Sequence, residues 1–515
     1  DPWPVAADGL GATLELRDSK VAKAAQSKWY SWRSSTEMGG SPAAAGTGPL
    51  GVVINEILAN PSGTDSDSIE LHNTTTGPIN VGGWFLSDSA DDPFKYQIPA
   101  GISIPSGGFV NFTQNQFDFG LSRDGDSVYL VRGSVAGGVT QFVDDVHFGA
   151  TLLGESWGRS PDGEGRLTPL QSRTLGASNS APRVGPLVVT EIQYNPSLSE
   201  AVQSAYPTVE ASDLEFVEIH NPATNPVNPV LLTDWRLRGG VDFDFPDGTT
   251  LASGETLVVL KFNPSDPENI NELNAFRLAY DIGAEVRLLG GYSGQLNNSD
   301  DRVQLQRAVP SGTDVTRVQE DEVLYDDQKP WPINADGSGR TIQRISATHY
   351  GNAGASWYSG PGTPGVVPDR IAGDMDGNGV VDAEDINAMF VQMRSATPDL
   401  NFDLDGDGLV NETDRDLLVK REMGIYYGDA NFDGYFDSAD LIEVLASNEY
   451  EDDIPGNSIW QTGDWDGDGD FQTLDMILAL ADGGYENGAF AVPARAEAAA
   501  DELAAALLED RRLRA

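Results

Sequence analysis

A twelve-residue, aspartate-rich pattern constrains this chain most, because it occurs four times between residues 374 and 475. Each copy has oxygen-bearing side chains at positions 1, 3, 5 and 9, a glycine at position 6 and a carboxylate at position 12. Alternate residues of such a loop turn their oxygens inward, and the glycine permits the sharp turn. Four copies in register argue against an accidental, solvated acidic tract. The pattern therefore predicts up to four sites for calcium (Ca2+).

The candidate ligands of each loop are five side chains and the backbone carbonyl of position 7. Loop 1 contributes Asp374, Asp376, Asn378, Val380, Asp382 and Asp385, and loop 2 contributes Asp403, Asp405, Asp407, Leu409, Asn411 and Asp414. Loop 3 contributes Asp429, Asn431, Asp433, Tyr435, Asp437 and Asp440, and loop 4 contributes Asp464, Asp466, Asp468, Asp470, Gln472 and Asp475. We expect position 12 to contact the ion through both carboxylate oxygens.

An apolar stretch with helical periodicity follows each loop, and we expect helices at 383–393, 412–423, 438–446 and 473–481. The aspartate of position 12 then lies in the first turn of each helix. A negative group is favourable there because the amino-terminal end of the helix dipole is positive. The same residue is therefore expected both to bind the ion and to stabilise the helix.

The charge balance limits the classes of partner. The chain has 32 basic and 80 acidic residues, a net charge of −48. Nucleic acids and anionic membrane surfaces would be repelled by such a surface. The sequence has no run of 18 apolar residues, so we expect no membrane span.

The chain contains no cysteine. A disulfide framework, a zinc site with thiolate ligands and a cysteine nucleophile are therefore excluded. Calcium reaches millimolar concentration outside cells, and loops closed by aspartate rather than the longer glutamate suit that condition. We expect the protein to be extracellular or located at the cell surface.

Residues 48–367 have the pattern of a β protein that is repeated once. Short apolar runs at 52–57, 68–73 and 84–88 are followed by similar runs at 187–192, 215–221 and 234–237, with turn residues between them. Two insertions, near 199–212 and 263–282, enlarge the second copy. Strands at this spacing predict two β-sandwiches, at 48–184 and 185–367.

The motifs of both copies resemble the lamin-tail domain. The first copy has I-N-E-I at 54–57, I-E-L-H-N at 69–73 and G-W-F-L-S-D at 83–88, and the second has T-E-I at 190–192 and V-E-I-H-N at 217–221. The second copy departs from the pattern at Trp235, which lacks the preceding glycine. The resemblance implies an immunoglobulin-like sandwich, in which we expect Trp84 and Trp235 to be equivalent core residues. That family occurs in nuclear lamins and in many exported bacterial proteins.

Residues 1–47 resemble the closing part of the second copy. Both segments have the letters P-W-P, then A-D-G, a short strand and a Trp-Tyr pair, at Trp29-Tyr30 and Trp357-Tyr358. We interpret 1–47 as the carboxyl-terminal end of a preceding module of the same kind. It is either a piece shared with a neighbouring molecule or a remnant of a longer chain.

The four loops resemble those of dockerins, the calcium modules that bind cohesins in bacterial enzyme complexes, because each helix follows its loop without a clear helix before it. A typical dockerin has two loops, so residues 373–486 form either a double dockerin or a dockerin-like calcium spacer. The residues at loop positions 10 and 11, which contribute to partner choice in dockerins, differ among the four loops. The tail at 487–515 is rich in Ala, Leu and Glu and predicts a helix.

These features favour a mainly β fold: tandem immunoglobulin-like sandwiches followed by a small α-helical, dockerin- or EF-hand-like calcium domain. Four histidines in repeated or isolated positions form no catalytic set, so we expect no enzyme activity. The leading hypothesis is a calcium-binding structural or adhesive protein that assembles into a filament or surface layer. One alternative is an accessory arm of an extracellular enzyme system that binds a cohesin-like receptor or a glycan. Another is a fragment of a hydrolase whose catalytic domain precedes Asp1.

Overall fold

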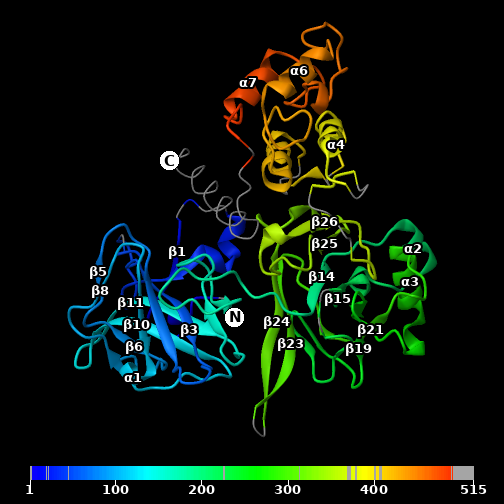
Figure 1. Ribbon diagram of the computed structural model, residues 1–515. Helices are drawn as coiled ribbons and strands as arrows, with labels where there is room; N and C mark the ends of the chain where they lie inside the picture. The colour runs from blue at the N-terminus through cyan, green and yellow to red at the C-terminus, as the bar shows by residue number, and fades with distance from the viewer. Residues whose placement is uncertain are drawn as a thin grey trace. The chain divides into compact units, whose positions relative to one another are not determined.

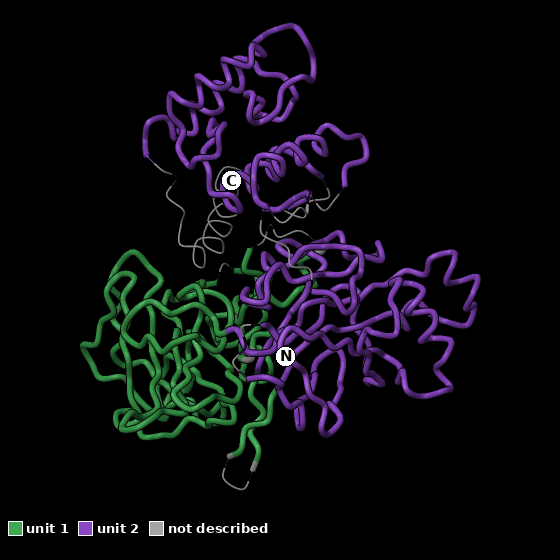
Figure 2. The backbone as a smooth tube through the Cα atoms, turned by 45° about the vertical axis from the view of Figure 1, so that its right-hand side comes forward, with its two compact units in different colours: residues 1–183, 307–319 green, residues 184–306, 320–515 purple. Residues whose placement is uncertain are grey.

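The computed structural model describes residues 3–18, 20, 23–44, 46–223, 225, 227–311, 314–367, 373–376, 380–399, 402–404, 409–488 and 490. The chain divides into two compact units, which Figure 2 colours separately. Unit 1 contains residues 1–183 and 307–319, and unit 2 contains residues 184–306 and 320–515.

Unit 1 contains the first sandwich. One sheet has the strand order β13-β12-β3-β4-β9 and the other has the order β11-β10-β6-β7, and their apolar faces share one core. The five-stranded sheet contains β3 (Val52–Leu58), β4 (Ser68–Asn73), β9 (Phe109–Thr113), β12 (Ser156–Gly158) and β13 (Thr168–Pro169). The other contains β6 (Phe85–Ser87), β7 (Tyr96–Gln97), β10 (Asp126–Ser134) and β11 (Gly138–Phe148), while β5 (Ile79–Asn80) pairs with β8 (Ser103–Ile104) and α1 (Gln114–Phe117) follows β9.

Unit 2 begins with the second sandwich, apart from residues 307–319 of that sandwich, which belong to unit 1. Its sheets have the orders β21-β20-β15-β14-β25-β26 and β22-β18-β17-β23-β24, around a second core. The first sheet contains β14 (Val188–Gln193), β15 (Phe216–His220), β20 (Thr256–Leu260), β21 (Leu288–Gly290), β25 (Thr341–Arg344) and β26 (Trp357–Gly360). The second contains β17 (Arg236–Gly239), β18 (Val241–Asp244), β22 (Ser293–Gly294), β23 (Asp300–Ser311) and β24 (Asp314–Asp326), and β16 (Val230–Leu231) pairs with β19 (Thr250–Leu251).

The two sandwiches share structural details at equivalent positions of the sequence repeat. Strand β3 pairs with β4 with a register shift between Ile54 and Glu56, and β14 pairs with β15 with a shift between Val189 and Glu191. Trp84 and Trp235 are 7% and 6% exposed and lie in the two cores, as expected. The expectation of two β-sandwiches is confirmed.

The two insertions of the second copy form helices. The first contains α2 (Glu200–Ala205), and the second contains α3 (Ile270–Tyr280). Val202 and Ala275 join these helices in one apolar cluster, and Phe276 packs edge-on against Phe216 of β15. The insertions therefore cover the face of the β14–β15–β20 sheet that points away from the main core (Figure 1).

The amino-terminal segment contains the hairpin β1 (Leu14–Leu16) and β2 (Trp32–Ser34), which forms a separate two-stranded sheet. Ala6 and Ala12 pack against Phe85, Val131 and Phe142 of the first sandwich. The amide of Phe142 also donates to the carbonyl of Thr36. Within this chain, the segment therefore covers the outer face of the β6–β10–β11 sheet.

The remainder of the described chain, 373–490, is here called the calcium-loop region, after the four loops that the sequence predicts to bind calcium. Its helices are α4 (Ala383–Met393), α5 (Glu412–Asp416), α6 (Ser438–Ala446) and α7 (Thr473–Ala481), and Leu417–Met423 continues α5 as a π-helix. These bounds agree with the four predicted helices. One apolar cluster, which includes Ile386, Leu418, Val444 and Ala479, connects all four helical segments.

Two further expectations concern other parts of the chain. None of the helices described in this structure is long and apolar enough to cross a membrane, which agrees with the expected absence of a span. The predicted tail helix lies outside the described residues, because these end at residue 490.

Candidate metal centre

The aspartate at position 12 is completely buried in every loop. Asp385, Asp414, Asp440 and Asp475 are each 0% exposed. A buried carboxylate is costly unless its oxygens have partners, so the contacts of these four residues reveal how each loop is built.

The same backbone amides donate to position 12 in each loop. The amide of position 2 donates to one carboxylate oxygen, from Met375, Leu404, Ala430 and Trp465, over 2.6–3.0 Å. The amide of position 9 donates to the other oxygen over 2.9 Å in all four loops. In loops 1, 3 and 4 the amide of position 3 is a further donor. Position 12 therefore closes the loop by joining its beginning to its end.

Positions 9 and 12 also begin the helix that follows. Position 9 is the N-cap of α4, α5, α6 and α7, and its amide donates to the aspartate of position 12 in the arrangement of a capping box. In loops 1 to 3 the side chain of position 9 additionally accepts from the amide of position 11. The loop and the helix thus depend on the same two residues.

The aspartate at position 1 organises the centre of the two loops that are described completely. In loop 4 the two carboxylate oxygens of Asp464 accept from the amides of Gly467 and Gly469 over 2.8 and 3.0 Å. In loop 3 those of Asp429 accept from Asp433 and Gly434 over 3.1 and 2.9 Å. Gly434 and Gly469, at position 6, have φ angles of 87° and 97°, so the turn uses a conformation that favours glycine.

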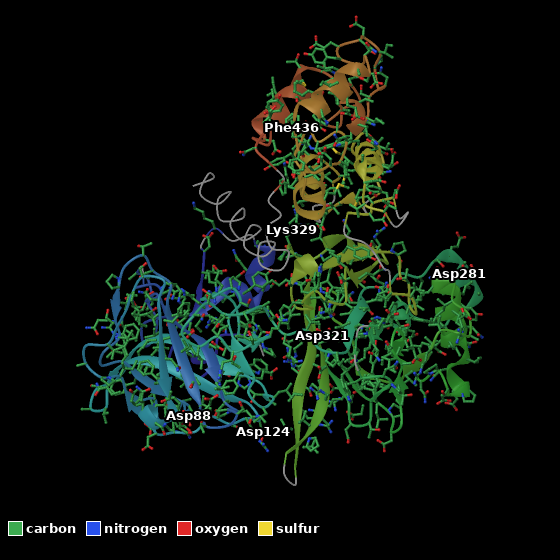
Figure 3. The ribbon with its side chains drawn as sticks, viewed as in Figure 1. Asp88, Asp124, Asp281, Asp321, Lys329 and Phe436 are labelled. Atoms are coloured by element: carbon green, nitrogen blue, oxygen red, sulfur yellow. The ribbon has the colours of Figure 1, made fainter. Side chains whose placement is uncertain are left out.

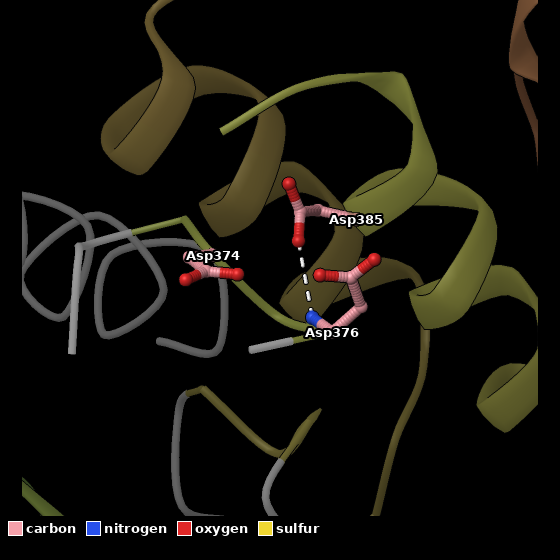
Figure 4. Close-up of side chains that lie close together, drawn as sticks. All are labelled: Asp374, Asp376 and Asp385. Atoms are coloured by element: carbon pink, nitrogen blue, oxygen red, sulfur yellow. Dashed lines mark hydrogen bonds between the residues drawn. The ribbon is translucent and has the colours of Figure 1, made fainter. Parts of the chain in front are cut away.

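Among the described residues, carboxylate oxygens converge in two of the loops. In loop 1, one oxygen from each of Asp374, Asp376 and Asp385, at positions 1, 3 and 12, lies within 4.8 Å of the others. In loop 4 the same holds for Asp464, Asp466 and Asp468, at positions 1, 3 and 5. Figure 4 shows the first group, with Asp385 on α4 and the amide of Asp376 donating to it over 3.0 Å. Three hard oxygen donors at this separation suit a calcium ion.

The loops bury negative charge that has little compensation from the protein. Burial raises the pKa of Asp464 and of Asp429 to about 7, and that of Asp466 to about 6. Burial also raises the pKa of Asp385, Asp440 and Asp475, although amide donors oppose the shift. A bound cation would stabilise the ionised form of these groups, so the electrostatics favour a cation at the loops.

The other predicted ligands are placed as follows. The side chains at position 7 of loops 1 to 3 are exposed: Val380 by 55%, Leu409 by 60% and Tyr435 by 47%. They point away from the loop, so the backbone carbonyl is the metal ligand expected from this position. Asp470, at position 7 of loop 4, accepts from the amide of Gly456, and Gln472 is exposed with its amide 3.4 Å from Asp468. Asn378, Asp405 and Asp407 lie outside the described residues.

Two arginines at loop 4 were not predicted. Arg394, the C-cap of α4, donates to the carboxylate of Asp464 over 3.3 Å and to the carbonyl of Gly467 over 2.8 Å. Arg415 of α5 donates to the carbonyl of Asp466 over 2.6 Å. Neither residue lies in loop 4, and no local spacing indicates such contacts.

Each sandwich contains a pair of buried glutamates on neighbouring strands. Glu56 lies opposite Glu70, and Glu191 lies opposite Glu218. Glu56 and Glu70 accept from the amides of Thr174 and Gly176, while Glu191 and Glu218 accept from those of Thr363 and Gly365. These carboxylates therefore hold the Thr-x-Gly segment that ends each sandwich.

The comparison with protein-family models agrees with this fold. The Lamin Tail Domain family model matches residues 46–148 and 180–322. Among solved structures, a DUF4876 family protein from Bacteroides thetaiotaomicron VPI-5482 matches 62% of this chain and 95% of that chain, with 13% identity and a TM-score of 0.25. No curated protein matches the sequence. The chain thus carries, in tandem, two regions that match the lamin tail domain family.

Proposed function

We propose that the calcium-loop region binds calcium, with up to four ions. The observation that carries the proposal is the repeated position-12 aspartate, which is fully buried in all four loops and held by the same amides. If these aspartates served only to cap the helices, one aspartate near the protein surface would be enough for each helix. Capping would not need the convergent carboxylates of loops 1 and 4.

Calorimetric titration of the full, decalcified chain with calcium chloride tests this proposal. We expect up to four bound ions, and one fewer in Asp468→Ala, which removes an exposed candidate ligand of loop 4. Glu443→Ala removes an equal charge from the exposed surface of α6, outside the loops, and should leave the number unchanged. Absence of calcium binding by the unmodified chain would contradict the proposal.

We further propose that the whole chain is a calcium-stiffened structural or adhesive protein, outside the cell or at its surface, without catalysis of its own. Two tandem sandwiches with large cores act as rigid spacers, and the net charge of −48 suits a medium rich in divalent cations. Analytical ultracentrifugation and electron microscopy with and without calcium test it. Calcium-dependent filaments or layers are expected, and a monomer under all conditions would count against self-assembly.

A second candidate function is a docking arm that binds a protein partner through the calcium-loop region, as dockerins do. Exposed aliphatic side chains on the last two helices favour it: Ile442, Leu445, Leu474, Ile477 and Leu480 are between 49% and 69% exposed. Along α7, three of them are spaced by three residues and form one stripe. Docking would be supported if the unmodified chain binds immobilised cohesins and the Ile477→Glu variant does not. Equal binding of the unmodified chain and the variant would count against it.

A further inference from the structure

Helix α4 has contacts with two of the calcium loops, one at each end. Its amino-terminal end belongs to loop 1, because Asp382 is its N-cap and Asp385 lies in its first turn. Its carboxyl-terminal end lies against loop 4, where the C-cap residue Arg394 donates to Asp464 and to the carbonyl of Gly467. These loops are 90 residues apart in sequence, so only the tertiary structure connects them.

The contact at loop 4 is tight. A Cβ atom added to Gly467 would lie 2.9 Å from Phe390 and 3.3 Å from Met393, so the last turn of α4 packs directly on the loop backbone. Asp464 is 0% exposed, and Arg394 is the cation that reaches its carboxylate over 3.3 Å. A shift of this end of α4 would therefore move the backbone and a carboxylate that form the fourth candidate site.

The middle of α4 also contacts the segment that leads into loop 4. The side chain of Asn387 accepts from the amide of Trp460 over 2.9 Å and donates to Gln461 over 2.9 Å. Trp460 is fully buried, and its indole donates to the carbonyl of Asp429 at position 1 of loop 3. The position of α4 is thus transmitted to loop 4 through side-chain contacts as well as through Arg394.

We propose that α4 couples calcium binding in loop 1 to calcium binding in loop 4. An ion in loop 1 holds Asp385, which closes that loop and begins α4; a well-formed α4 in turn holds loop 4 in its binding conformation. By linkage, an ion in loop 4 then favours an ion in loop 1 to the same extent. This inference rests on the proposed calcium binding, and Arg394 acts as a positioning residue.

A double-mutant cycle on the full chain measures the coupling. Asp376→Ala removes an exposed candidate ligand of loop 1, and Asp468→Ala removes one of loop 4. The total free energy of calcium loading is measured for the unmodified chain, both single variants and the double variant by competition with a chromogenic chelator. If the sites are coupled, the losses of loading free energy in the two single variants add up to more than the loss in the double variant. We expect calcium in one loop to raise the affinity of the other roughly tenfold, which is within the usual range for coupled sites.

Variants of the connection identify the route. Arg394→Met keeps the aliphatic packing but removes the hydrogen bonds to loop 4, and should reduce the coupling factor to less than half. Arg421→Met is the matched control, because Arg421 pairs with Glu422 on the π-helix. Circular dichroism of each variant establishes that the helices remain, and Asp376→Asn replaces Asp376→Ala if they do not.

The outcomes separate the two proposals. No calcium binding by the unmodified chain would overturn the proposed function itself. Calcium binding with additive losses in the cycle would overturn the coupling alone. Coupling that is unchanged by Arg394→Met, or equally reduced by Arg421→Met, would overturn the role of α4 and Arg394.

Discussion

Arg344 and Asp321 form an ion pair whose side chains are 0% and 2% exposed, inside the second sandwich. Asp321, labelled in Figure 3, accepts from the amide of Val189, and Arg344 donates to the carbonyl of the same residue. In the first sandwich, Asp144 and Arg159 hold the amide and the carbonyl of Ile54 in the same way. Val189 and Ile54 precede the register shifts of β14 and β3, so each ion pair satisfies the backbone where the strand pairing is interrupted.

Replacing Arg344 by methionine should destabilise the second sandwich by about 3–5 kcal/mol, because it leaves Asp321 buried without its cation. The unfolding free energy from urea titration checks this. Arg159→Met in the first sandwich is the control and should cost less, since that pair is 10% and 16% exposed. The double variant Arg344→Met with Asp321→Leu should recover part of the loss, and equal losses for all three variants would contradict the argument.

The buried glutamates predict an unusual pH dependence. Burial, reinforced by the charge of Glu218, raises the pKa of Glu191 to about 8, and burial raises that of Glu218 to about 7. The folded state therefore binds more protons than the unfolded state between about pH 4.5 and pH 8. The stability that these groups contribute is present below that range and is lost as the pH rises through it.

Thermal unfolding at a series of pH values checks this expectation. The transition of the second sandwich should move to lower temperature between about pH 5 and pH 8. Glu191→Gln keeps an acceptor for Thr341 and Thr363 but cannot ionise, so its profile should be flatter. A transition that rises with pH in the unmodified chain would refute the assignment.

Removal of a core tryptophan should be costly in the first sandwich. Trp84 is 7% exposed, and the guanidinium of Arg132 lies 5.6 Å from its ring centre. Trp84→Ala should lower the unfolding free energy by about 3–5 kcal/mol, the usual range for emptying such a site. Trp84→Phe retains much of the apolar volume and should cost less. Near-equal stability of all three proteins in chemical denaturation would show that the ring contributes little to the core.

Chelation of calcium should unfold the calcium-loop region before the sandwiches. The helices begin at residues that also close the loops, so energy from the proposed calcium binding would be folding energy for α4 to α7. Differential scanning calorimetry with excess chelator should show one transition moving to lower temperature while the others stay. Asp475→Asn should shift the same transition in the presence of calcium. A calorimetric profile that is insensitive to chelator would be incompatible with the calcium proposal.

Deletion of residues 3–44 should expose Phe85, Val131 and Phe142, against which Ala6 and Ala12 pack. We therefore expect a less stable first sandwich, measured by urea unfolding, and increased binding of an apolar dye. The alternative interpretation, that this segment completes a neighbouring molecule, predicts a smaller mass in solution after the deletion. Ultracentrifugation of the unmodified and the deleted chain, with calcium present, distinguishes the two interpretations. Only completion of a neighbouring molecule predicts that the deletion changes the assembly state.

The sequence by itself determined the elements whose signals are local. The helices of the calcium-loop region agree with the expected bounds because the residues that begin them, such as Asp382 and Asp385, lie three positions apart. The strands that contain I-N-E-I and V-E-I-H-N were also predictable, because short apolar runs bounded by turn residues repeat in both copies.

Only the tertiary structure decided the contacts between residues that are distant in sequence. Arg394 reaches Asp464 across 70 positions, and Glu191 meets Thr363 across 172, and neither pair has a recognisable spacing. The glutamates of V-E-I-H-N and I-N-E-I are buried beneath the closing segments of the sandwiches, and no local pattern in the sequence indicates this burial. The physical reason is that a carboxylate tolerates burial wherever amide and hydroxyl donors converge on it, and their convergence depends on how the whole chain packs.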